Sequence, residues 1–310
     1  MKAKPLDIRK VFAAIDGKPL SQRIALRGMT DIKSELSNRS KIASVQQVQA
    51  ARAYKKVFAP LVETIAKNRQ ARQGLQELQR LAKIDDRRFP TPGRLPRFPT
   101  VKPQIRSGSF LRVFVPPYDF AWTDKSSPIL IARGAPAVRA RKDVGEFLAY
   151  SDPYGNSTGS FSEWTAAGVG IFFRPLSTNE WVRFTPLIKY NYAWQDRSQA
   201  GFTAHSSGYL AIRVVSTDSR GGDMTIETDP RFQIWNDGTG WYDTHSDYMD
   251  WAFFQNQQIF FPATSDRMYF LWIWCYVNAD DHGDDFAGSG SWARGWLDSV
   301  VPFAVTEEFT

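Results

Sequence analysis

The stretch from Trp235 to Trp251 holds the residues whose chemistry is most readily interpreted. It mixes aromatic rings with carboxylates, an amide, hydroxyls and a histidine. Sugar-binding sites use this mixture, because rings stack on the apolar faces of pyranoses while carboxylates and amides bind the hydroxyl groups. The alternative is that the rings belong to the core or to strand edges and that the aspartates form turns. The candidate ligand-binding residues are Trp241, Tyr242, Asp243, His245, Asp247 and Trp251.

Catalysis has weaker support in the sequence. Asp243 and Asp250 could supply the acid and base of a glycoside hydrolase. The chain has only three histidines, and it contains no P-loop, G-x-S-x-G, H-E-x-x-H or helix-opening GxGxxG motif. We therefore expect a protein that is not an enzyme, with hydrolysis kept as an alternative.

A second acidic stretch runs from Asn278 to Asp285 and reads as a loop. Clustered oxygen ligands can hold Ca²⁺, although this spacing is not that of an EF-hand and a solvated turn is the alternative. The candidate calcium ligands are Asp280, Asp281, Asp284 and Asp285, and no other cofactor is expected. The single cysteine, Cys275, excludes an intramolecular disulfide, and its apolar neighbours predict a small buried side chain.

Charge divides the chain into two unlike parts. Residues 1–106 hold 24 Lys+Arg and 8 Asp+Glu, a balance of +16, whereas residues 107–310 hold 15 and 24, a balance of −9. The basic part predicts contact with an anionic partner, which could be nucleic acid, phospholipid or an acidic protein. The alternatives are a solvated helix face, or docking on the acidic part of the same chain. The candidate anion-binding residues are Arg52, Lys55, Lys56, Lys67, Arg69 and Arg72.

Apolar spacing predicts that residues 1–87 are mostly helical. The expected helices are 8–15, a short one after Ser21, and a long amphipathic stretch over 41–83. Pro60 predicts a kink there or two helices, 41–58 and 60–84. Residues 88–106 are rich in proline and predict an extended linker, so the expected units are 1–87, 88–106 and 107–310.

Short strand patterns separated by turn residues recur from Ser109 onward. They include an expected hairpin turn at 236–239. Together they predict an all-β antiparallel sandwich, jelly-roll-like, that follows the basic helical segment in an α+β chain. The run Met268–Val277 is apolar on both alternating faces, which predicts a central strand. We expect a second sheet to cover one of its faces and the N-terminal helices to cover the other.

Four functions are consistent with these features. The first is a non-enzymatic binding protein, in which the β-domain recognises a glycan or a protein partner and the basic helices anchor or oligomerise the chain. The second is a shell protein, since a basic arm joined to a jelly roll resembles the plan of coat proteins of small RNA viruses. Against it, such arms are usually dense Arg/Lys runs, whereas here the charge is spread along amphipathic helices. The third is a membrane-active, pore-forming protein, and the fourth is the hydrolase.

The start of the chain lacks an apolar h-region, and the longest apolar stretch is the ten residues Met268–Val277. A spanning helix needs about 20 apolar residues. We therefore expect a soluble, homo-oligomeric protein without a transmembrane span or signal peptide, cytoplasmic as synthesised. Export by a non-classical route and particle assembly both remain open.

Overall fold

The computed structural model describes two sheets, one short helix and several separate helical residues. The described residues are 29–38, separate positions between 49 and 77, 110–125, 138–152, 159–175, 180–198, 203–218, 223–240, 243–254, 257–283 and 292–309. The predicted helix 8–15 and the predicted linker 88–106 lie outside them.

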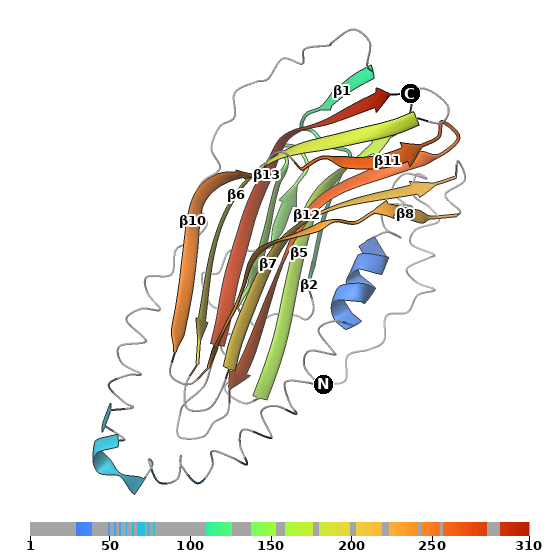
Figure 1. Ribbon diagram of the computed structural model, residues 1–310. Coiled ribbons are helices and arrows are strands. Elements are labelled where there is room, and N and C mark those ends of the chain that lie inside the picture. The colour runs from blue at the N-terminus through green and yellow to red at the C-terminus, as the bar shows by residue number, and fades with distance from the viewer. Residues whose placement is uncertain are drawn as a thin grey trace.

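Thirteen antiparallel strands form the two sheets (Figure 1). Sheet A has the path β10 (Thr244–Phe254), β6 (Glu180–Arg197), β13 (Trp292–Phe309), β4 (Glu146–Ser151) and β3 (Arg139–Arg141), with β1 (Phe110–Phe114) on β13 and β11 (Ile259–Ala263) on β6. Sheet B has the path β2 (Phe120–Lys125), β5 (Gly159–Phe173), β12 (Met268–Gly283), β7 (Thr203–Thr217) and β8 (Thr225–Thr228), with β9 (Arg231–Gly240) on β7. The predicted β-sandwich is therefore confirmed.

The strand order shows how the chain passes between the sheets. Sheet A contains the series β10-β6-β13-β4, and sheet B contains β9-β7-β12-β5. Along the chain, β4 is followed by β5, β6 by β7, β9 by β10 and β12 by β13, so each of these four pairs crosses from one sheet to the other. Eight strands that alternate between two sheets in this way have the arrangement of a jelly roll.

The apolar faces of the long strands build the core between the sheets. Strand β12 lies between β5 and β7, as expected for a strand that is apolar on both faces. Leu271, Ile273 and Cys275 point into the main core with residues of sheet A, and Cys275 is fully buried. Trp272 and Trp274 point to the opposite face, where they belong to a second buried cluster. The prediction of a central, doubly covered β12 is confirmed.

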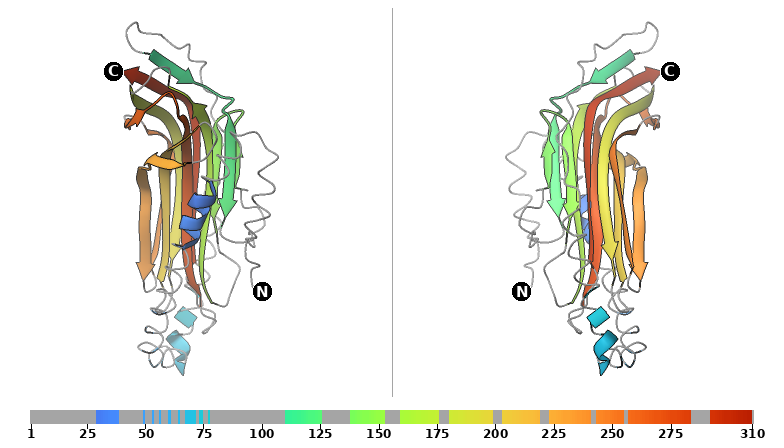
Figure 2. Two further views of the ribbon diagram at one scale, coloured as in Figure 1. Left: turned by 90° about the vertical axis from the view of Figure 1, so that its right-hand side faces the viewer. Right: turned by 90° about the vertical axis from the view of Figure 1, so that its left-hand side faces the viewer.

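Helix 29–38 covers that second face, and it is the short helix expected after Ser21 (Figure 2). Met29, Ile32 and Leu36 follow helical spacing and are all buried against the aromatic side chains of sheet B. Their apolar contact explains why so short a helix is stable here, since isolated helices of this length are marginal in water.

Ion pairs hold the same helix in place at two points. Lys33 Nζ lies 3.0 Å from Asp124 Oδ1. Glu35 Oε2 lies 2.7 Å from Arg231 Nη2 and 3.3 Å from Arg213 Nη2. Arg213 is almost completely buried, and its ion pairs with Asp229, at 2.7 Å, and with Glu35 together compensate a cation withdrawn from water.

Several local predictions differ from the structure. The turn expected at 236–239 is wrong, because these residues continue β9 and pair with β7, where Gly238 faces His205. The loop expected at 278–285 is also wrong over residues 278–283, because β12 continues to Gly283 and remains paired with β5. The residues at these positions favour turns, but backbone pairing with the neighbouring strand continues from the apolar parts of β9 and β12 and outweighs that preference.

The basic segment shows a helix start that the sequence analysis did not identify. Asn68 is not helical, and its Oδ1 accepts hydrogen bonds from the backbone N–H groups of Gln70 and Ala71, as an N-cap does. Pro60 itself is helical. Residues 57–59 and 61–63 lie outside the described part, so the kink expected at Pro60 stays a prediction.

Candidate functional site

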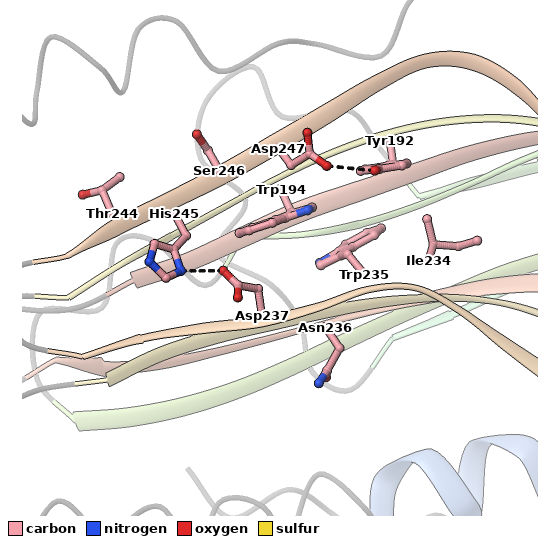
Figure 3. Close-up of a pocket in the computed structure, with 10 residues that line it drawn as sticks. All are labelled: Tyr192, Trp194, Ile234, Trp235, Asn236, Asp237, Thr244, His245, Ser246 and Asp247. Carbon is pink, nitrogen blue, oxygen red and sulfur yellow. Dashed lines mark hydrogen bonds and ion pairs between the residues drawn. The ribbon is translucent and has the colours of Figure 1, made fainter.

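A pocket opens where β6, β9 and β10 meet at one edge of the sandwich (Figure 3). Its volume is about 580 Å³. Strand β6 belongs to sheet A and β9 to sheet B, so the pocket lies between the two sheets where β10 forms the edge. The lining residues are Tyr192, Trp194, Ile234, Trp235, Asn236, Asp237, Thr244, His245, Ser246 and Asp247.

Three aromatic rings form the inner wall of the pocket. Tyr192 stacks on Trp235 with ring centroids 5.5 Å apart and an interplanar angle of 20°. The indole Nε1 of Trp235 donates a hydrogen bond to Ser206 Oγ at 3.1 Å. Trp194 and Tyr192 are each less than a tenth exposed, so little of either side chain is open to solvent.

A glycine makes room for the central ring. Gly208 is paired with Trp235 across the β7–β9 ladder, and a methyl group at this glycine would overlap the indole. Gly208 does not line the pocket, but its lack of a side chain allows the Trp235 ring to occupy its position in the pocket wall.

The mouth of the pocket carries a histidine between two carboxylates. His245 Nδ1 lies 2.7 Å from Asp237 Oδ2, and its Nε2 lies 2.9 Å from Asp243 Oδ2. The hydrogen bond to Asp237 and the neighbouring negative charges raise the pKa of His245. When protonated, His245 can donate a hydrogen bond to each of the two aspartates.

Asp247 lines the other side of the mouth. Its Oδ2 accepts a hydrogen bond from the Tyr192 hydroxyl at 2.9 Å. Burial, followed by this contact, raises the pKa of Tyr192 to about 12. The Tyr192 hydroxyl therefore keeps its proton at neutral pH and donates it to the hydrogen bond with Asp247.

A buried carboxyl lies beyond the inner wall. Asp196 Oδ2 accepts a hydrogen bond from the Ser206 N–H at 3.1 Å, while Oδ1 has no hydrogen-bond partner among the described residues. Burial raises the pKa of Asp196 to about 7. His205 lies close by, 3.0 Å from Asn236 Oδ1 through Nε2 and 3.6 Å from Asp280 Oδ2 through Nδ1. The hydrogen bond to Asp280 raises the pKa of His205.

The structure brings together half of the predicted ligand-binding residues. His245 and Asp247 line the pocket, and Asp243 contacts His245. Trp251 is half-buried on β10, where Lys189 Nζ lies 5.3 Å from its ring centroid, and it does not line the pocket. Trp241 and Tyr242 lie outside the described residues.

The sequence analysis missed the contribution of β6. Tyr192 and Trp194 precede His245 by about fifty positions and reach the site only because β10 pairs with β6. In the sequence, Tyr192 and Trp194 are visible only as alternate residues on one face of an apolar strand. This pattern is the same for core residues and for pocket residues, so it could not identify the site.

The proposed calcium ligands and the proposed catalytic pair remain predictions. Asp280 is buried in β12, where it accepts a hydrogen bond from Asn278 Nδ2, and Asp284 and Asp285 lie outside the described residues. Within the described ranges, no group of three or more His, Cys, Asp or Glu side chains is placed to hold a metal ion. Asp250 lies exposed on β10.

The basic segment is described at three of its six candidate residues. Lys56, Lys67 and Arg69 are helical and exposed, and Arg52, Lys55 and Arg72 lie outside the described part. No helix among the described residues is long and apolar enough to cross a membrane.

Comparisons with known proteins give no family. No family model matches the chain, and no curated protein matches it. Among solved structures, a complex of TmCBM61 with beta-1,4-galactotriose aligns at 12% identity over 63% of this chain and 86% of that chain, with a TM-score of 0.15. Infectious bursal disease virus, Gt strain, aligns at 8% identity over 69% and 45%, with a TM-score of 0.15, and the Gx strain at 10% identity over 71% and 47%, with a TM-score of 0.14. Likenesses this weak carry no functional argument.

Proposed function

We propose that this chain is a shell-forming subunit, in which the jelly roll assembles with other copies and the basic N-terminal part binds nucleic acid. The observation that carries the proposal is the joining of a +16 segment, residues 1–106, to a jelly-roll body of charge −9. Such a body repels a polyanion while the N-terminal part attracts it, so nucleic acid is directed to one part of each subunit. Jelly rolls are among the folds that build virus capsids, although the fold alone does not assign the function.

The test is assembly with nucleic acid. Purified chain is mixed with single-stranded RNA or DNA, and particles are sought by electron microscopy and by protection of the nucleic acid from nuclease. We expect closed particles that contain nucleic acid. A chain that stays monomeric and leaves the nucleic acid unprotected at low salt would contradict the proposal.

The salt dependence of nucleic-acid affinity tests whether the basic segment itself contacts the phosphates. Neutralising Arg52, Lys55, Lys56, Lys67, Arg69 and Arg72 to Gln removes up to six phosphate contacts. For single strands this should reduce the slope of log affinity against log salt by about four. An unchanged slope would place the nucleic-acid contacts elsewhere.

The pocket favours a second candidate function, the binding of a polyhydroxylated ligand such as a glycan. The supporting observation is the mouth, where Asp237, Asp243 and Asp247 offer acceptors next to the His245 donor. The experiment is a titration with oligosaccharides followed by NMR of the tryptophan indoles. Binding that is lost in Asp247→Asn would support this function, whereas shifts that ignore the substitution would contradict it.

A further inference from the structure

Exposed apolar side chains gather at one edge of sheet A. Seven large apolar side chains in the described part of the chain are exposed, and five of them lie on β6, β10 and β11. We call this the β10–β11 edge. Its residues are Trp181 (52% exposed), Tyr248 (66%), Met249 (41%), Phe253 (51%) and Phe260 (50%).

Strand register shows that four of these side chains face away from the core. Phe253 pairs with Lys189 and Phe260 with Arg183, whereas the neighbouring residues Ile188, Phe254 and Phe261 point into the core. Trp181, two positions before Arg183, lies on the same outer face as Phe260. Tyr248 pairs with Ala193, which is also outside the main core. The apolar surface therefore runs along the outer side of both strands.

The backbone at this edge is also unpaired within the described part of the chain. Strands β10 and β11 both pair with β6, on the side opposite β13. No further described strand pairs with either of them. Unpaired strand edges with apolar side chains favour association with another polypeptide, because the partner can satisfy backbone groups and cover the rings.

Charge selects the kind of partner. Asp247 and Asp250 are exposed on β10, and Asp243 precedes the strand. Two cations lie on the same outer face: Lys189, whose Nζ lies 5.3 and 5.5 Å from the centroids of the Trp251 and Phe253 rings, and Arg183, which forms an ion pair with Glu307. The surplus of carboxylates disfavours nucleic acid and anionic lipid, and it also disfavours symmetric pairing of β10 with the β10 of another copy.

A basic amphipathic segment is complementary to this surface, and the chain itself carries one. Residues 41–83 combine an apolar stripe with an excess of Lys and Arg. At the described positions between 49 and 77 every residue except Ala71 is exposed, including Lys56, Lys67 and Arg69. Those positions are therefore not packed against the body of their own copy.

We propose that the β10–β11 edge binds the basic amphipathic segment 41–83 of a second copy. This inference rests on the proposed shell function and names the contact between its subunits. Rings at the edge pack on the apolar stripe, and the exposed Asp250 lies opposite its Lys and Arg side chains. Because each copy offers one edge and one segment, the contact is head-to-tail and can propagate around a closed shell.

A charge swap between copies tests the inference in protein free of nucleic acid. The edge variant is Asp250→Lys, and the segment variant is Lys67→Glu with Arg69→Glu. Sedimentation velocity should show self-association about tenfold weaker for each variant alone than for the unmodified chain. Mixing the two variants should restore association, because a basic segment then meets an acidic edge and an acidic segment meets a basic edge.

Matched control substitutions show whether a loss of association is specific to the β10–β11 edge or follows from any change of charge or exposed apolar surface. Asp143→Lys makes the same charge change in the β3–β4 turn, at the opposite edge of sheet A, and should leave association unchanged. Phe253→Ser should weaken association about tenfold, whereas Ile226→Ser, equally exposed on β8, should not.

Three results would overturn the inference. They are a monomeric wild-type chain, variants that associate as the wild type does, and variants whose mixture fails to restore association. In each case particle formation with nucleic acid remains a separate measurement. Shells that form normally with Asp250→Lys would thus refute this contact and leave the proposed function standing.

Discussion

At the scale of single residues, the pocket depends on the fit between Gly208 and Trp235. The indole occupies the volume that a side chain at position 208 would need, and it stacks on Tyr192 from the other sheet. A ring held in this way ties β7, β9 and β6 together at the point where the pocket begins. The geometry of the site therefore rests on packing as much as on its polar groups.

Gly208→Ala should displace the Trp235 ring. Overpacking of this kind costs about 1–3 kcal/mol, so we expect a lower free energy of unfolding in urea and an altered tryptophan fluorescence spectrum. Gly240→Ala is the matched control, because a methyl group there has no neighbour within 4 Å. Equal stability of the two variants would show that the ring is not confined as described.

Asp196 should make stability depend on pH. Burial raises its pKa to about 7, so the folded chain holds this proton more tightly than the unfolded chain does. The contribution of Asp196 to the free energy of unfolding is then greatest below about pH 4, falls by roughly 1.4 kcal/mol per pH unit as the pH rises toward 7, and is constant above that. Glu163 and Asp298, whose pKa values burial also raises to about 7, act in the same direction.

Asp196→Asn removes one of the three titrating carboxyl groups, since the amide is neutral at every pH. Urea denaturation at pH 5 and at pH 8 should show a smaller loss of stability for this variant than for the unmodified chain. Parallel curves for the two proteins would mean that Asp196 is already ionised in the folded state at pH 5.

At the scale of elements, helix 29–38 acts as a cover for sheet B. Ile32 is 1% exposed among the aromatic side chains of the second cluster. Without the helix, Trp272 and Trp274 would face water. The helix and the body therefore stabilise each other, even though the sequence places them far apart in charge and composition.

Ile32→Ala should weaken this cover. Large-to-small substitutions at buried sites cost about 2–5 kcal/mol, and we expect faster hydrogen exchange in the helix and in β12. Lys33→Gln, which removes a pair whose lysine is 40% exposed, should cost no more than about 1 kcal/mol. The reverse order of the two effects would show that charge rather than packing holds the helix.

At the scale of the whole molecule, the jelly roll leaves its two outer faces unequal. Helix 29–38 covers sheet B, whereas the β10–β11 edge of sheet A keeps five apolar side chains exposed. An asymmetric subunit of this kind suits head-to-tail contacts, in which one surface of each copy binds a different surface of the next copy.

Removal of residues 1–40 should expose the aromatic face of sheet B, because it deletes helix 29–38. We expect the shortened chain to bind a hydrophobic dye and to aggregate. Removal of residues 1–28 alone keeps the helix and serves as the control. A monodisperse chain 41–310 that does not bind the dye would show that the body is complete without its helix.

Sequence alone determined the features that depend on local pattern. Alternating apolar residues from Phe110 onward predicted a sandwich, and the doubly apolar run Met268–Val277 predicted a strand covered on both faces. These predictions succeeded because successive residues of a strand point to opposite faces, so the spacing of apolar residues indicates which face is buried. The hydrogen-bond ladders that extend β9 through Gly238 and β12 to Gly283 could not be read in this way, because they depend on the neighbouring strand.

Only the tertiary structure decided which residues share a site. His245 and Asp247 were visible in the sequence as chemically active types, but their partners Tyr192 and Trp235 come from strands that meet through pairing and sheet packing. The exposed edge likewise emerges only when β10 and β11 are both found on β6. Contacts between residues distant along the chain are fixed by the register and stacking of sheets, and periodicity records the face of a residue without recording what lies opposite it.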